Sequence, residues 1–112
     1  MEARLKSGIR VSALIRRCDL AALGVVVAAK GDPDAGAILI KLNGREAGCT
    51  VLAEARRPDG ARVWLRATGA APVAEPEADA YIARQRGRDP DLWVVEIDSA
   101  AVDAIVDAPI MS

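Results

Sequence analysis

The sequence predicts one small α+β domain, in which an antiparallel meander sheet of about five strands packs against two helices, in the order α-β-β-β-β-α-β. Its 112 residues are 52% hydrophobic, which suffices for one continuous core but not for two domains. Two segments repeat apolar residues at helical spacing. Five short segments rich in branched residues are separated by dense turn signals.

The first helix is expected at about residues 11–22, with Gly24 as its stop. The apolar residues of this stretch fall on one helical stripe: Val11, Leu14, Ile15, Cys18 and Ala22. The sequence therefore predicts a short amphipathic helix that covers one face of the sheet.

Four strands are predicted to follow as an antiparallel meander. Residues 25–30 and 37–42 are expected to pair as a β-hairpin across the turn at 31–36, which contains Asp32, Pro33 and Asp34. Asn43-Gly44 is a strong hairpin signal before a strand at about 49–55. Pro58-Asp59-Gly60 then leads into a strand at 62–67.

A second helix and a fifth strand complete the predicted domain. Pro76 suits a first helical position, and this helix is expected to end before Asp89-Pro90. The strand at 92–98 places Trp93, Val95 and Ile97 on one face, where Trp93 is expected to anchor the core. We expect both helices on one face of the sheet, and residues 99–112 as a loosely attached tail of the single domain 1–112.

Several segments of the sequence, taken together, are the basis for a resemblance to a known family. They are residues 4–9 and 11–17, the loop 31–36, residues 62–69, and residues 77–86 continuing into 89–96. This set resembles a small bacterial family known only as a domain of unknown function. The resemblance extends to about Asp98. It implies a single-domain bacterial cytoplasmic protein and assigns no catalytic residue.

The charge distribution argues against a globally basic or acidic partner. Fifteen Lys and Arg oppose sixteen Asp and Glu, for a net charge of −1. Residues 1–30 carry about +4 and residues 89–112 about −6, so the two ends can attract each other within or between subunits, although solvated surfaces are the leading interpretation. Arginines interrupt the apolar stretches of the first thirty residues, so neither export nor membrane insertion is expected, and the predicted location is the cytoplasm.

The residue types present offer little for catalysis. The chain has no His, which removes the commonest general base and most zinc sites. Cys18 and Cys49 fit reduced, core-packed thiols better than a disulfide, although Arg16 and Arg17 beside Cys18 could lower its pKa. The carboxylates of residues 31–36 favour a turn over a calcium loop. We therefore expect no catalytic residue, no metal site and no cofactor.

The strand at 62–67 carries the candidate interaction face. Alternation places Arg62, Trp64 and Arg66 on one side, and Lys41 and Arg56 from neighbouring strands could join them. An exposed Trp between arginines could stack on single-stranded nucleic acid or anchor a protein interface. The structural alternative is that Trp64 is buried beneath a helix, with the arginines at its edge.

Three function classes remain open from the sequence. The leading one is a non-catalytic interaction or regulatory module that self-associates or binds a protein partner. The alternative is sequence-tolerant binding of RNA or single-stranded DNA through the Arg/Trp face. An enzyme ranks third, because no nucleophile and base occur at a recognisable spacing.

Overall fold

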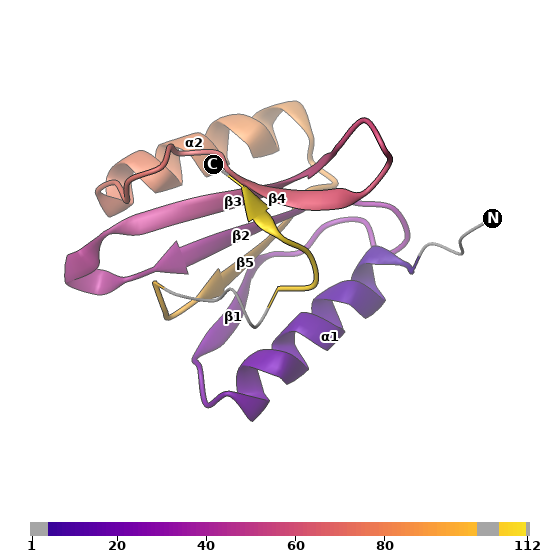
Figure 1. Ribbon diagram of the computed structural model, residues 1–112, viewed down its shortest axis with the longest axis horizontal. Coiled ribbons are helices and arrows are strands. Elements are labelled where there is room, and N and C mark those ends of the chain that lie inside the picture. Colours follow the sequence, from indigo (N-terminus) through magenta and orange to yellow (C-terminus); the bar gives the residue numbers. More distant parts are fainter. Residues whose placement is uncertain (1–4, 101–105, 112) are drawn as a thin grey trace.

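The computed structural model describes residues 5–100 and 106–111, and it confirms the α+β class with two helices. The helices are α1 (Ser7–Leu20) and α2 (Glu75–Arg88). The strands are β1 (Val25–Ala29), β2 (Ile38–Asn43), β3 (Cys49–Arg56), β4 (Arg62–Arg66), β5 (Trp93–Ile97) and β6 (Ile110–Met111), with a short 3-10 helix, η1 (Arg45–Ala47), between β2 and β3. They form one sheet in the order β1-β5-β2-β3-β4-β6 (Figure 1).

The prediction of a purely antiparallel meander of five strands is wrong. The meander holds for β2, β3 and β4. However, β5 pairs in parallel with β2 and antiparallel with β1, so it separates the two strands predicted to form a hairpin. β6 adds an unpredicted sixth strand that runs parallel to β4. The physical reason lies in β5, whose Trp93, Val94, Val95 and Ile97 are all buried and therefore need neighbours on both sides and cover on both faces.

The prediction that both helices lie on one face of the sheet is also wrong. α1 packs Val11, Leu14 and Cys18 on one face, against a cluster that includes Ile40 and Val95. α2 packs Ala78 on the opposite face, in a cluster with Leu39, Val51 and Val94. Figure 1 shows α1 in front of the sheet and α2 behind it. All six residues of β2 are buried, so the sheet needs a cover on both faces.

The loop at 31–36 crosses the end of β5 instead of forming a hairpin turn. The N–H of Asp32 donates to the carbonyl of Asp91 at 2.9 Å, and the indole N–H of Trp93 donates to the carbonyl of Asp32 at 2.7 Å. The loop also receives the start of α1, where the Ser7 hydroxyl donates to the Gly36 carbonyl. This contact lets α1 begin four residues before the predicted Val11.

Part of the predicted tail packs on the sheet. The N–H of Trp64 donates to the carbonyl of Pro109 at 2.8 Å, and β6 pairs beside β4. Residues 101–105 and 112 of that tail lie outside the described residues. No helix within the described ranges has the length and apolar character needed to cross a membrane.

Candidate functional site

The structure answers the question that the sequence left open about Trp64. Arg62, Trp64 and Arg66 do share one face of β4, but Trp64 is only 2% exposed and belongs to the core cluster on the α1 side. The structure therefore agrees with the alternative in which Trp64 is a buried core residue and not an exposed one. Trp64 therefore offers no surface on which a base could stack, which removes the observation that favoured nucleic-acid binding.

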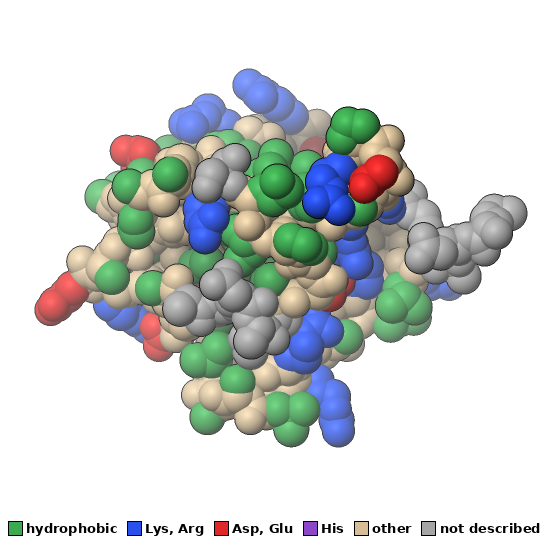
Figure 2. Space-filling view, in the orientation of Figure 1, with side chains coloured by type: hydrophobic (Ala, Val, Ile, Leu, Met, Phe, Trp, Pro, Cys, Tyr) green, Lys and Arg blue, Asp and Glu red, His purple; other side chains and the backbone are tan. Residues whose placement is uncertain are grey.

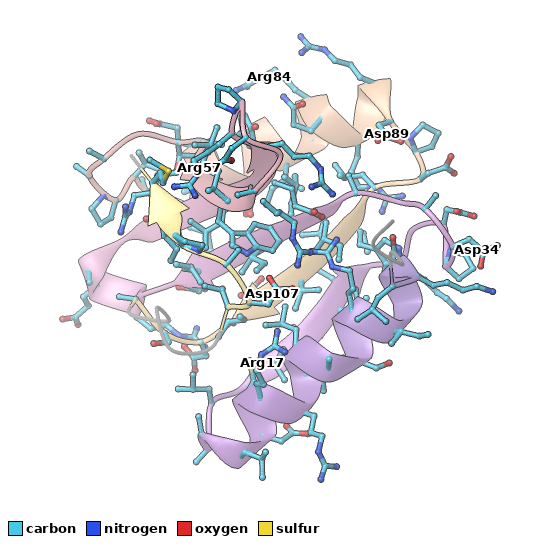
Figure 3. The ribbon with its side chains drawn as sticks, turned by 45° about the vertical axis from the view of Figure 1, so that its right-hand side comes forward. Arg17, Asp34, Arg57, Arg84, Asp89 and Asp107 are labelled. Carbon is cyan, nitrogen blue, oxygen red and sulfur yellow. The ribbon has the colours of Figure 1, made fainter. Side chains whose placement is uncertain are left out.

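Asp107 fixes the edge of this buried Trp. One carboxylate oxygen accepts from the indole N–H of Trp64 at 3.2 Å, and the other accepts from Nη2 of Arg62 at 2.9 Å. Nη2 of Arg10 lies 3.9 Å from the second oxygen. Figure 3 shows Asp107 between α1 and the sheet. Arg10 and Asp107 are thus one pair that joins the basic N-terminal region to the acidic C-terminal region within a subunit.

Arg10 was not singled out by the sequence, yet it connects α1 to the sheet. Its Nη1 donates to Oε2 of Glu54 at 2.9 Å, while Oε1 of Glu54 accepts from the N–H of Ile38. Nε of Arg10 is buried and has no hydrogen-bond partner among the described residues. The only sequence signal for Arg10 was that it is one of the arginines that interrupt the apolar stretches of the first thirty residues.

A groove with a volume of about 660 Å³ opens beside these residues. Its polar lining contains Arg10, Arg56, Arg62, Glu54 and Asp107, and Asp34 lies at its α1 end (Figure 3). The rest of its lining consists mainly of small residues: Ala35, Gly36, Ala37, Gly60, Ala61, Ala108 and Pro109. The groove therefore brings together Arg56 and Arg62 of the predicted face, whereas Arg66 is not part of its lining.

Lys41 does not belong to that face, so this part of the prediction is wrong. It projects to the α2 side and is 5% exposed, with Nζ 2.6 Å from Glu75, 2.8 Å from Asp79 and 3.4 Å from Glu96. Burial by itself would lower the pKa of Lys41, but the hydrogen bonds to Asp79 and Glu75, with the charge of Glu96, raise it well above its usual range. Lys41 is thus a buried cation that ties α2 to the sheet.

The two thiols are free, buried and on opposite faces of the sheet. Burial raises the pKa of the Cys18 thiol and outweighs the opposing charge of Arg17. Burial likewise raises the pKa of Cys49, against the smaller effect of Lys41. The sheet between them separates the two sulfurs, so the fold does not bring them together as a disulfide pair.

The outer edge of β1 is the second surface with an unusual composition. Residues 20–29 contain only Leu, Ala, Gly and Val. Leu20 is 77% exposed, Val26 55% and Val27 36%. Figure 2 shows hydrophobic side chains at the lower end of the molecule, where α1 ends and β1 begins. Within the described ranges, no cluster of three Cys, Asp or Glu residues is arranged to hold a metal ion.

Comparison with known proteins finds one family and several solved structures. A family model described as "Protein of unknown function (DUF1491)" matches residues 5–107. The chain is 39% identical to a DUF1491 family protein from Caulobacter crescentus CB15. Its crystal structure gives a TM-score of 0.85 and covers 96% of this chain and 100% of that one.

Two further solved structures show the same fold. A solution structure of a DUF1491 family protein from the same organism is 39% identical, with a TM-score of 0.83 over 99% of this chain and 100% of that one. Protein Atu0922 from A. tumefaciens is 29% identical, with a TM-score of 0.79 over 98% of each chain. No curated protein matches the chain.

Proposed function

Because the chain belongs to the DUF1491 family, whose model describes proteins of unknown function, we propose its role from its own surface: a non-catalytic interaction module that self-associates through the outer edge of β1. The observation that carries this proposal is the uncharged apolar segment at residues 20–29, which ends in an edge strand. The proposed location is the cytoplasm, which the two free thiols support.

The edge of β1 lacks most of the features that keep edge strands from pairing. Soluble proteins protect such edges with charged side chains, Pro, bulges or very short strands. The opposite edge follows this pattern, since β6 has two residues and Pro109 precedes it. β1 has five residues with neither charge nor Pro, and its one irregularity, between Val27 and Ala29, leaves Val25 to Val27 in regular pairing.

The backbone of β1 can pair with a second copy of itself. The N–H of Asp98 donates to the carbonyl of Gly24 at 2.9 Å, so strand alternation directs the backbone groups of Val25 and Val27 away from the sheet. An antiparallel partner related by a twofold axis at Val26 places Val25 of each copy opposite Val27 of the other. These are the two residues with outward-facing backbone groups, and the two sheets become continuous.

Charge favours the same antiparallel arrangement. In this register Lys30 lies opposite the partner's Ala22, whose N–H is bonded to the carbonyl of Asp19 at the C-terminal end of α1. A cation is stabilised near the carbonyl end of a helix, and Asp19 adds a negative charge there. A parallel pairing in register would instead place Lys30 beside Lys30. The favoured occupant of this edge is therefore a second copy, related by the twofold axis and antiparallel to the first.

The test is the oligomeric state of Val26→Lys, which adds a charge to the exposed edge without removing a buried side chain. Wild type is expected to sediment as a dimer at micromolar concentration, and Val26→Lys as a folded monomer, because two lysines would meet at the twofold axis. Ile9→Lys is the matched control, since Ile9 is similarly exposed at 53% but lies on α1. A wild type that stays monomeric, or a Val26→Lys variant that stays dimeric, contradicts the proposal.

A further inference from the structure

The groove beside Asp107 contains two like charges in direct opposition. Arg56 of β3 and Arg62 of β4 are register partners in an antiparallel pair, so their side chains project from the same face as neighbours. Like charges at directly opposite positions destabilise a sheet. An anion placed between the two guanidinium groups would remove that repulsion.

The chain itself supplies only part of the required negative charge. Arg62 is paired with Asp107 at 2.9 Å, and Glu54 is already engaged by Arg10. Arg56 has no carboxylate within ion-pair distance among the described residues, and its Nη1 donates to the carbonyl of Gly60 at 2.7 Å. Arg56 is exposed at the groove with most of its donors available to a ligand.

Asp107 shows which chemistry the groove recognises. Its carboxylate, carried by the bend at residues 106–108, receives the guanidinium of Arg62 and the indole N–H of Trp64, with Arg10 at 3.9 Å. Arginine suits such contacts because its planar donors match the geometry of a carboxylate.

The remainder of the lining favours a peptide over a nucleic acid. Asp34, Glu54 and Asp107 give the lining as many carboxylates as guanidinium groups, so it suits one anionic group at Arg56 better than a continuous chain of phosphates, and none of the described residues that line the groove is aromatic. The exposed carboxylate of Asp34 can accept from the N–H groups of a peptide, and the Ala and Gly walls leave room for its backbone. A volume of about 660 Å³ lies within the roughly 300–1,000 Å³ typical of ligand sites.

We propose that this groove binds an extended peptide segment of a partner protein through one acidic side chain, whose carboxylate is held between Arg56 and Arg62. This site is separate from the edge of β1, and neither proposal depends on the other. Arg56 is the residue to change, because Arg62 also holds Asp107 in place.

The experiment measures fluorescence polarisation, at low salt, of an end-capped, fluorescein-labelled peptide of Ala and Gly with one central Glu. The same labelled peptide with Gln in place of Glu is the probe control. Wild type is expected to bind the Glu peptide and not the Gln peptide. Arg56→Gln is expected to weaken that binding about tenfold, because one charge-assisted contact is lost.

Arg57→Gln is the matched protein control. Arg57 adjoins Arg56 in sequence and is also exposed, but it does not line the groove and its partner is Asp59. The proposal requires Arg57→Gln to bind within twofold of wild type, and amide chemical shifts to change at Gly36, Gly60 and Ala61. It is overturned by equal loss in both variants, by no preference for the Glu peptide, by shifts confined to β1, or by tighter Arg56-dependent binding of an oligothymidylate.

Discussion

Lys41 is buried, yet its charge is retained because three carboxylates surround its ammonium group. Its pKa in the folded chain lies above the ordinary value of 10.5, so this group contributes stability that is fully present below that value. That contribution is lost as the pH rises through the folded-state pKa. Across the neutral range Lys41 therefore stabilises the contact of α2 with the sheet independently of pH.

The thiols provide a prediction at the scale of single residues. Cys18 and Cys49 are 0% and 1% exposed, and burial raises the pKa of both, so little thiolate is present at neutral pH. Both should react with an aromatic disulfide reagent only slowly in the folded protein, and at the rate of a free thiol in urea. Rapid stoichiometric labelling of either thiol with the fold intact would show that these side chains are accessible.

At the scale of elements, the connections between strands depend on close backbone approach. A Cβ at Gly36 would lie 2.2 Å from the carbonyl oxygen of Asp91 and 2.9 Å from that of Asp32. Neither backbone oxygen can move without shifting the loop that covers the ends of α1 and β5. The loop at 31–36 therefore needs Gly36 for space, where the sequence alone suggested a hairpin turn.

Two Gly→Ala substitutions separate this effect from helix propensity. Gly36→Ala is expected to lower the free energy of unfolding by about 1–3 kcal/mol through overpacking. Gly87→Ala in α2 is expected to raise it by up to about 1 kcal/mol, because a Cβ there meets nothing within 4 Å and Ala favours the helix. Urea titrations of both variants give the two free energies. Opposite signs support the assignment, and a neutral Gly36→Ala contradicts it.

At the scale of the whole molecule, β5 is the strand that contributes to the core on both faces of the sheet between β1 and β2. It lies between β1 and β2, and one face contributes Trp93, Val95 and Ile97 to the α1-side cluster while Val94 contributes to the α2-side cluster. The prediction that Trp93, Val95 and Ile97 share a core face is confirmed. A change in this strand should therefore affect the stability of the entire domain.

Trp93→Ala tests that dependence. Trp93 is 5% exposed and its indole N–H donates to the carbonyl of Asp32, so its truncation leaves a cavity and removes one of the two hydrogen bonds that this carbonyl accepts. We expect a loss of about 3–5 kcal/mol in the free energy of unfolding, measured by urea with circular dichroism. Ile9→Ala, at an exposed position, should remain within about 0.5 kcal/mol of wild type. Equal midpoints for the two variants would contradict a core role for Trp93.

The candidate groove could be predicted only in part. Strand alternation correctly placed Arg62 on the same face as Trp64, and Arg56 proved to be its cross-strand neighbour. Lys41 was assigned to the wrong face of the sheet, because the face of a side chain depends on the register of the strands. Lys41 and Leu39 lie on one face of β2, and their partners Val51 and Ala53 lie on the same face of β3. Ala53 in turn pairs with Leu65 of β4. Lys41 thus shares a face with Leu65, and a shift of one residue would reverse that assignment.

The sequence by itself determined both helices, the meander of β2, β3 and β4, and the alternation within each strand, because these follow from side-chain periodicity and turn chemistry over a few residues. Only the tertiary structure decided that β5 inserts between β1 and β2, that the helices cover opposite faces, and that Trp64 is buried beneath Asp107. These outcomes depend on contacts between residues more than forty positions apart, such as Trp64 with Asp107 and Asp32 with Trp93. Local periodicity shows that a strand has two faces, but only the packing of the whole chain selects which neighbour pairs with it and which element covers each face.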